Sequence, residues 1–288
     1  MGLPSDSDYN GAIQNPGTCF QDVDLRAGNV ELMPTLPLPK ARSGNFATVY
    51  KVVSRGTAWA VRCFTRAIPQ DQQRRYEEIS RTVAAANLPY FVGFSYLPQG
   101  IRVGSQWFPI VKMEWASGEP LDSYVARRLT SPTALSELAV AWVEMTAALE
   151  RAGIAHGDLQ HGNVLVSNGT LRLVDYDGMF VPSLAGSRAP EVGHRNYQHP
   201  CRDDAHFGPW LDHFSSWVVF VSLVGLAVDP GLWQRHKGGD DCLLLRREDF
   251  LSPDRSLVCV FRPSRSAIPA DADHPYRQGD HPGRDAAG

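Results

Sequence analysis

Residues 154–178 constrain the fold more than any other part of this 288-residue chain, because they place polar side chains around a predicted hairpin. Ahead of them, Thr133–Ala152 carries apolar residues at helical spacing, which predicts an amphipathic helix with one buried face. Two β-rich runs then flank Asn168-Gly169, a dipeptide that strongly favours a two-residue hairpin turn. The polar loops on either side of the hairpin supply Asp158, Asn163 and Asp175. We expect this order of helix, loop, hairpin and loop to bring the three side chains together.

The two polar loops resemble the catalytic loop and the metal-binding loop of the protein kinase-like superfamily, in the form of bacterial-type Ser/Thr kinases. The resemblance lies in the sequences HGDLQHGN at 156–163 and DYDG at 175–178. It implies a phosphotransferase that uses ATP and Mg²⁺. Asp158 would accept the proton of the acceptor hydroxyl, and Asn163 and Asp175 would hold the metal on the phosphates. The resemblance thus makes Asp158, Asn163 and Asp175 the candidate catalytic residues, and the latter two the candidate metal ligands.

The N-terminal half carries further matches to the same family. Residues 43–51, SGNFATVYK, resemble the glycine-rich loop and the strand after it, and Ala60-Val61-Arg62 stands where the family has Val-Ala-Ile-Lys. Residues 112–119 resemble the hinge that meets the adenine. The resemblance implies nucleotide-binding roles for Gly44, Val49, Ala60, Arg62, Glu78, Met113, Glu114, Ala116 and Glu119. The resemblance implies that Glu78, on a helix predicted over 70–87, positions Arg62, and Glu77 is the alternative to Glu78. Asp122 is the alternative to Glu119.

A second set of matches follows the hairpin. Residues 193–200 align with the family's Gly-Thr-x-x-Tyr-x-Ala-Pro stretch, which docks the protein substrate. Asp212 heads an apolar run at 214–228, where the family keeps its central helix and the aspartate that anchors the catalytic loop. His156 is expected to hold the catalytic loop by hydrogen bonding. The literal Ala-Pro-Glu at 189–191 lies too near the metal-binding loop, so we interpret it as a coincidental match.

The order of elements predicts an α+β, bilobal protein kinase-like fold. We expect an N-lobe at about 39–113 with an antiparallel β-sheet and one helix, and a hinge at 114–117. A mainly helical and shortened C-lobe follows at 118–262. Residues 1–38 are rich in Pro, Gly, Asn and Asp and predict an irregular arm, and residues 263–288 predict a disordered tail.

Several positions depart from the family's pattern and bear on activity. Arg62 replaces a lysine, which keeps the charge but exchanges a compact ammonium for a planar fork. Gln160 replaces the lysine of the catalytic loop, and Cys201 replaces the glutamate of Ala-Pro-Glu. Gly157 replaces an arginine that would receive a phosphate on the activation segment, which indicates a site that assembles without phosphorylation. Asp177 replaces a glycine, and it is either a further metal ligand or a solvated turn residue.

Three functional hypotheses follow from these matches and departures. The first is an active protein Ser/Thr kinase, because the residues for proton transfer and metal binding are all retained. The second is a pseudokinase or adaptor that binds nucleotide or a partner without turnover, which Arg62 and Gln160 favour. The third is a small-molecule phosphotransferase, because the catalytic loop also resembles that of aminoglycoside and choline kinases. The docking stretch at 193–200 favours a protein substrate or partner.

Charge and composition exclude other classes of partner. The chain has 28 basic and 31 acidic residues, so its net charge of −3 lacks the basic footprint of a nucleic-acid-binding protein. The longest apolar run, at 217–228, is too short to cross a bilayer, and we expect no membrane association. Five scattered cysteines form no disulfide pattern and favour a cytoplasmic location. The His-rich and Cys-containing stretch at 194–213 matches no zinc motif, so we assign its polar residues to the docking loop.

Overall fold

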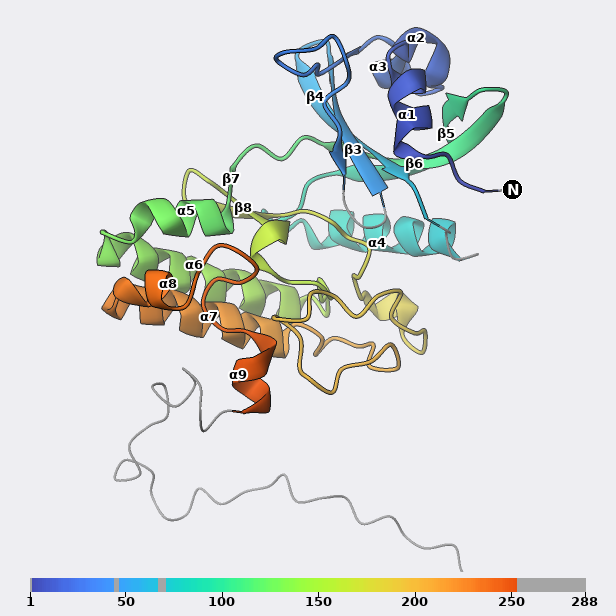
Figure 1. The fold of residues 1–288 in the computed structure, drawn as a ribbon. Coiled ribbons are helices and arrows are strands. Elements are labelled where there is room, and N and C mark those ends of the chain that lie inside the picture. The colour runs from blue at the N-terminus through green and yellow to red at the C-terminus, as the bar shows by residue number, and fades with distance from the viewer. Residues whose placement is uncertain (1, 44–46, 67–70, 253–288) are drawn as a thin grey trace, which may run out of the picture. The chain divides into compact units, whose positions relative to one another are not determined.

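The computed structural model describes residues 2–43, 47–66 and 71–252. Residues 1–247 form one compact unit, and residues 248–288 form a second unit, of which 248–252 are described. The first unit contains a β-sheet lobe and a mainly helical lobe, which confirms the α+β architecture expected from the sequence (Figure 1). Gly44 and the predicted tail at 263–288 lie outside the described residues, as does the predicted boundary at residue 262.

The first lobe is built on an antiparallel sheet with the strand order β1-β3-β4-β6-β5, and β2 pairs with β3 on one side. Its strands are β1 (Asn29–Val30), β2 (Arg42–Ser43), β3 (Ala47–Ser54), β4 (Thr57–Phe64), β5 (Phe94–Val103) and β6 (Gln106–Glu114). Side chains alternate between the faces of a strand. Val61 and Cys63 of β4 therefore join the hydrophobic core on one face, and Arg62 and Phe64 project from the other.

Helix α4 (Gln72–Ala86) covers the face of the sheet from which Arg62 projects. Tyr76 contacts both β4 and β5, because its ring centre lies 6.1 Å from that of Phe64 and 5.5 Å from that of Tyr96. The helix ends at Asn87, whose backbone adopts a left-handed conformation with φ 45° and caps the last turn. This end agrees with the helix predicted over 70–87.

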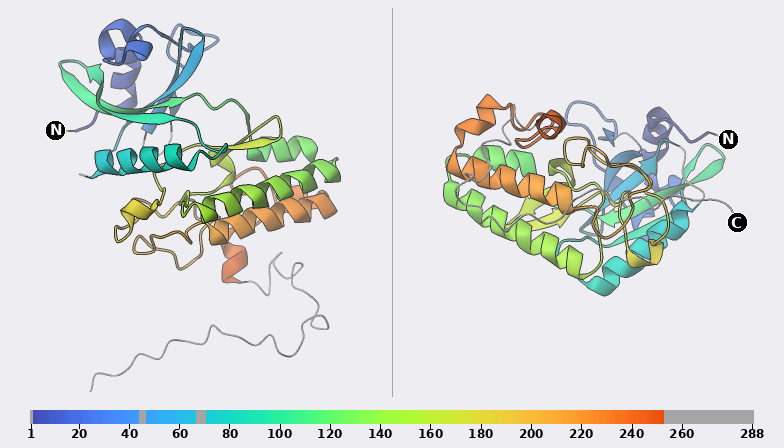
Figure 2. Two further views of the ribbon diagram at one scale, coloured as in Figure 1. Left: turned by 180° about the vertical axis from the view of Figure 1, so that it is seen from behind. Right: turned by 90° about the horizontal axis from the view of Figure 1, so that it is seen from below.

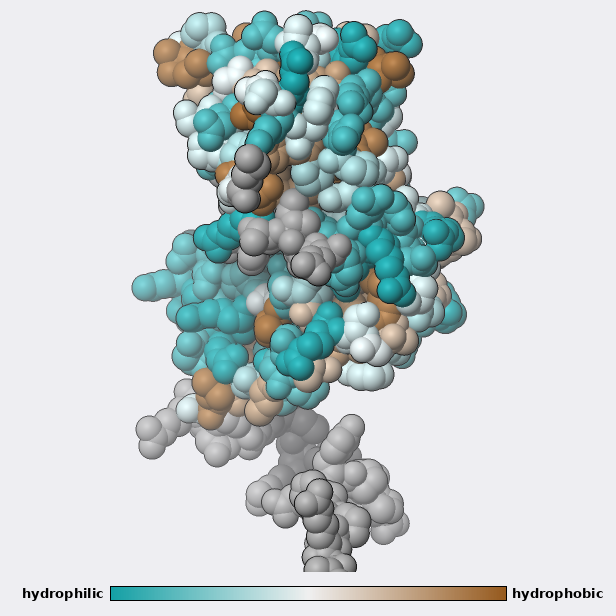
Figure 3. All heavy atoms as spheres, turned by 90° about the vertical axis from the view of Figure 1, so that its right-hand side faces the viewer, coloured by the Kyte–Doolittle hydropathy of each residue, from teal (hydrophilic) through white to brown (hydrophobic). Residues whose placement is uncertain are grey.

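Three short helices cover the opposite face of the sheet: α1 (Asp6–Ile13), α2 (Pro16–Cys19) and α3 (Val23–Arg26). Ser5 and Asp8 form a reciprocal capping box that starts α1. Tyr9, Ile13, Phe20 and Leu25 are buried in one core with strand residues, and these helices lie over β3 and β5 in Figure 1. Residues 6–26 therefore form short helices that pack in the core of the N-lobe, whereas the composition of 1–38 had led us to expect an irregular arm. On the side of the molecule shown in Figure 3, the surface is mostly hydrophilic.

The second lobe places a small sheet, β7-β8-β9, beside two long helices. Its elements are β7 (Glu119–Pro120), α5 (Leu121–Arg128), α6 (Pro132–Arg151), η1 (His161–Asn163), β8 (Val164–Ser167), β9 (Thr170–Leu173), η2 (Pro182–Leu184), α7 (His213–Val228) and α8 (Gly231–Arg235). Helix α9 (Arg247–Leu251) begins at the last residue of the first unit, and its other residues belong to the second unit. Helices α6 and α7 lie side by side in both views of Figure 2, and the fully buried Trp142 of α6 donates to the Ser216 carbonyl at 3.0 Å. Within the described ranges, we find no helix with the length and apolarity needed to span a membrane.

Candidate active site

A cavity of about 800 Å³ is lined by residues of both lobes. Val49 of β3 and Ala60 of β4 contribute apolar walls from one lobe, and Leu165 and Val174 contribute them from the other. The lining also includes Asp158, Asn163 and Asp175. The three side chains that the spacing in the sequence selected therefore share one cavity with an apolar slot.

The segment that joins the two lobes lines the same cavity with Met113, Glu114 and Ala116. The N–H of Glu114 donates to the Gly93 carbonyl at 3.0 Å, and the N–H of Trp115 donates to the Ala58 carbonyl of β4 at 2.9 Å. Met113 is buried, and Ala60 pairs with it across β4 and β6. A slot with apolar walls beside a strand end with backbone polar groups suits a planar heterocycle.

Asp158 is held by two hydrogen bonds, one to each carboxylate oxygen. The His194 N–H donates to Oδ1 at 2.6 Å, and the Asn163 amide donates to Oδ2 at 2.9 Å. The Asn163 amide also donates to the Asp158 carbonyl at 2.9 Å, which closes the loop between the two residues. Gln160 lines the cavity too, but its side-chain oxygen accepts from the Gly162 N–H at 2.8 Å and caps the turn η1. The replacement for the expected lysine thus has a local structural contact.

Asp212 anchors the loop at 156–163, as the resemblance led us to expect. The buried carboxylate of Asp212 accepts from the backbone N–H groups of His156 and Gly157, the latter at 2.9 Å. Burial raises the pKa of Asp212, and these donors together with nearby positive charge oppose that rise. The His156 ring Nε2 lies 3.0 Å from the Val174 carbonyl. The expected role of His156 as a hydrogen-bonding support for the loop is therefore confirmed.

The glycine at position 157 has a steric reason. Its φ is +80°, and a Cβ atom at this position would lie 2.0 Å from the Gly178 carbonyl oxygen. No side chain fits in that space without moving the backbone at Gly178. The absence of the family's arginine here follows from the close approach of the two loops.

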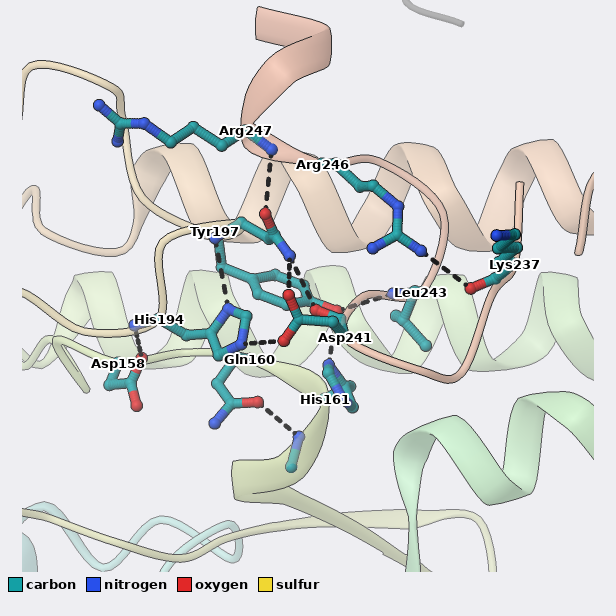
Figure 4. A network of polar contacts seen from close by, with 12 residues as sticks. Asp158, Gln160, His161, His194, Tyr197, Lys237, Asp241, Leu243, Arg246 and Arg247 are labelled. Carbon is teal, nitrogen blue, oxygen red and sulfur yellow. Dashed lines mark hydrogen bonds and ion pairs between the residues drawn. The ribbon is translucent and has the colours of Figure 1, made fainter. Parts of the chain in front are cut away.

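The segment after the cavity is fixed to a loop near the end of the first unit, and Figure 4 shows this network. The His194 ring lies 3.0 Å from an Asp241 carboxylate oxygen, and the Asn196 amide donates to Asp241 at 2.9 Å. The Tyr197 hydroxyl accepts from the Leu243 N–H at 2.8 Å, and it lies 2.6 Å from His161 Nδ1. The predicted docking stretch is therefore held on Asp158 by the backbone of His194 and on residues 241–243 by side chains of residues 194–197. Nothing in the sequence pattern indicated these last contacts.

Arg62 forms ion pairs with two carboxylates of the loop at 175–178. One guanidinium nitrogen donates to Asp175 and the other to Asp177. Burial disfavours the charge of Arg62, but the attraction of the two carboxylates outweighs it, so the pKa of Arg62 is raised. Burial by itself would raise the pKa of Asp175, yet Arg62 holds it below its usual value. Arg62 is therefore a fixed cation at the polar end of the cavity.

Two predicted nucleotide-binding residues lie away from the cavity. Glu78 does not pair with Arg62: its carboxylate lies 2.7 Å from Arg81, one helical turn further along α4, whereas the ion-pair partners of Arg62 are Asp175 and Asp177. Glu119 pairs with Arg127 of α5 and does not line the cavity. Of the other predicted residues, Val49, Ala60, Arg62, Met113, Glu114 and Ala116 all line it.

Sequence reasoning missed two acidic features of the site. Asp177 is neither a solvated turn residue nor free, since the Tyr76 hydroxyl of α4 donates to the carboxylate oxygen that Arg62 does not bind. Glu191 belongs to the Ala-Pro-Glu interpreted as a coincidence, and it lines the cavity. Burial, reinforced by the charges of Asp175 and Asp177, raises the pKa of Glu191 to about 8. No periodicity or spacing in the sequence signals either contact.

The donor set fits Mg²⁺ in kind. Asn163 and Asp175 line the same cavity and offer amide and carboxylate oxygens, which Mg²⁺ prefers, and this metal takes its other ligands from phosphates and water. Among the residues that the structure describes, no group of three or more His, Cys, Asp or Glu side chains is arranged to hold a metal.

Comparison with known proteins identifies the fold. No family model matches the chain, and no curated protein matches it in sequence. Among solved structures, the chain resembles the kinase PK-1 of the Cydia pomonella granulovirus, with a TM-score of 0.50 and 15% sequence identity over 70% of this chain and 69% of that one. The chain therefore has a protein kinase-like bilobal fold.

Proposed function

We propose that this chain is an ATP- and Mg²⁺-dependent phosphotransferase of the protein kinase type that acts on Ser or Thr hydroxyls of proteins. The observation that carries the proposal is the meeting of Asp158, Asn163, Asp175 and Arg62 in a cavity that also has an apolar slot. Phosphoryl transfer needs a positioned acceptor, metal ligands and positive charge near the phosphates. The polar side chains of this cavity match those three needs.

Each residue has a defined role in the proposal. Asp158 orients the acceptor hydroxyl and takes its proton, and the hydrogen bonds from His194 and Asn163 keep its carboxylate in place. Asn163 and Asp175 bind Mg²⁺ through their side-chain oxygens. When bound, the metal neutralises negative charge on the phosphates. Arg62 adds a cation on the same side, and the slot between Ala60 and Leu165 takes the adenine.

A protein acceptor is favoured by the segment 193–200. The backbone of His194 donates to the Asp158 carboxylate, and side chains of residues 194–197 are tied to residues 241–243. A wall fixed in this way beside the base can align an extended peptide with the acceptor hydroxyl pointing at Asp158. A small acceptor would not need such a wall.

A nucleotide-binding module without turnover is the second candidate. It is favoured by the ion pairs of Arg62 with both Asp175 and Asp177, which occupy the cation that would meet the phosphates. It is also favoured by Gln160, whose side chain caps a turn instead of supplying charge. Turnover, not binding, separates the two candidates.

An acceptor panel with ATP labelled on the γ-phosphate tests the proposal. The purified full chain is incubated with the labelled ATP and Mg²⁺ in three separate samples. The acceptor is a generic unfolded protein in the first, an aminoglycoside in the second and choline in the third. We expect label on Ser or Thr of the protein acceptor. Label only on a small molecule would contradict the substrate class, and saturable ATP binding without transfer to any acceptor would favour the module without turnover.

A further inference from the structure

We propose that Asp177 is the positioning residue of Arg62, in the role that the sequence assigned to Glu78 of the helix. This inference rests on the proposed function, because it concerns how the cation of the nucleotide site is held. Arg62 of β4 is positioned by the carboxylate of Asp177 and not by an ion pair with a residue of α4. Helix α4 holds that carboxylate in turn, through the hydroxyl of Tyr76.

The orientation of α4 explains why the helix contributes a tyrosine. Its buried side chains are Arg75, Tyr76, Ile79 and Val83, which recur at helical spacing and face the sheet and the metal-binding loop. Glu78 follows Tyr76 by two residues, so it points about 200° away around the helix axis. It pairs with Arg81 there. A helix in this orientation presents a hydroxyl to the loop and no carboxylate to the strand.

Helix α4 also holds the backbone of the loop near Asp177. The guanidinium of Arg75 lies 3.4 Å from the Asp177 carbonyl oxygen and 3.4 Å from that of Met179. Arg75 is buried and lies over the Phe207 ring, with 5.3 Å between the guanidinium carbon and the ring centre. The Asp177 residue is thus held by its side chain and by its carbonyl, both from the same helix.

The two carboxylates that bind Arg62 differ in their surroundings. The Asp177 side chain is 16% exposed and has a second partner in Tyr76, whereas the Asp175 side chain is 40% exposed and lines the cavity. Each takes a different nitrogen of the guanidinium. Asp175 can therefore turn to another cation while Arg62 stays bound to Asp177. The guanidinium nitrogen that Asp175 releases then faces the cavity, where it can donate to a phosphate.

The first test compares two charge-neutralising variants, Asp177→Asn and Glu78→Gln, with the parent chain. The dissociation constant for ATP with Mg²⁺ is measured by calorimetry, and the KM for ATP and kcat are measured where transfer occurs. We expect Asp177→Asn to weaken ATP binding about tenfold or more, because one hydrogen-bonded charge partner of Arg62 is lost, and to raise KM more than it lowers kcat. Glu78→Gln should stay within about twofold of the parent. Equal affinity in Asp177→Asn and the parent, or a loss in Glu78→Gln as large as in Asp177→Asn, would overturn the assignment.

Tyr76→Phe keeps the inference testable if Asp177→Asn does not fold. This variant removes one hydroxyl and keeps the ring that packs on Phe64 and Tyr96. We expect it to weaken ATP binding about threefold, because Asp177 loses its contact with the helix. An ATP affinity unchanged from the parent would show that the helix does not act through Asp177.

A third measurement separates this inference from the proposed function. Thermal unfolding midpoints are determined without nucleotide for the single variants Arg62→Gln, Asp177→Asn and Glu78→Gln. They are also determined for two double variants, Arg62→Gln with Asp177→Asn and Arg62→Gln with Glu78→Gln. The shifts should be non-additive for the first pair and additive for the second, because contacting residues couple and distant ones do not. Failure of the parent chain to bind ATP would refute the proposed function. Additive shifts for the first pair would refute the positioning role by itself.

Discussion

Replacement of Ile13 by alanine tests whether the N-terminal helices belong to the core of the N-lobe. Ile13 of α1 is fully buried among side chains of the sheet, including Tyr50 and Val61. Truncation of a buried isoleucine to alanine costs about 2–5 kcal/mol, which combines lost burial with the cavity left behind. For a chain of this size each kcal/mol lowers the unfolding midpoint by about 2–4 °C, so we expect a drop of roughly 5–15 °C.

The matched control is Val23→Ala in α3, because the Val23 side chain is 68% exposed. An exposed substitution of this kind changes stability by about 0.5 kcal/mol or less. Thermal unfolding of both variants and of the parent is monitored by circular dichroism. The expected result is a clear drop for Ile13→Ala and none for Val23→Ala. Similar midpoints for Ile13→Ala and the parent would refute the placement of α1 in the core.

Two further substitutions test the site. Gly157→Ala should destabilise the fold by more than about 3 kcal/mol, because the added Cβ would lie 2.0 Å from the Gly178 carbonyl oxygen. The control Gly169→Ala should cost about 1–2 kcal/mol, because Gly169 has a φ of +77° but open space around it. Similar unfolding midpoints for the two variants would contradict the close approach of the loops. Glu191 has a pKa raised from 4.5 to about 8, so its contribution to stability is present below about pH 4.5 and is lost as the pH rises through about 8. Between pH 5 and pH 8, the free energy of unfolding measured with denaturant should therefore fall less in Glu191→Gln than in the parent. The control Glu137→Gln, at an exposed position, should behave as the parent. Equal pH dependence in all three proteins would show that Glu191 is not buried beside other carboxylates.

The site's central residues could be predicted because they depend on local structure. Asn168-Gly169 fixes a tight hairpin, and the lengths of its flanking loops decide where Asp158 and Asp175 lie. The role of Asp212 came from the resemblance, which implies an anchoring aspartate at the head of the apolar run. The run forms α7, which has a buried face, although Trp217 and Val228 are exposed.

The orientation of α4 could not be predicted in the same way. A helix with Tyr76 and Glu78 on different sides can present either one, and the choice depends on packing against strands that lie elsewhere in the sequence. The partner of Arg62 depends on that choice. Asp177 was visible as a departure from the family's glycine, but its contact with Tyr76 links residues 101 positions apart.

The N-terminal helices were missed for another reason. Helices of four to eight residues are too short to show periodicity, and Pro, Gly and Asn lie among them. The local signals were the capping box of Ser5 and Asp8, the N-cap Asp22 of α3, and the spacing of Tyr9 and Ile13 by one helical turn. Their stability comes from tertiary packing on the sheet, which sequence patterns do not report.

Transfer of the γ-phosphate of ATP by the parent chain and by Asp158→Asn, with ATP affinity measured on the same samples, tests the central claim most directly. Asparagine keeps the size of the side chain but cannot accept the proton. The account predicts a loss of transfer of about a hundredfold or more in Asp158→Asn, with ATP affinity within about threefold of the parent. Equal transfer by the two proteins would contradict the claim that this cavity is a phosphotransfer site built around Asp158.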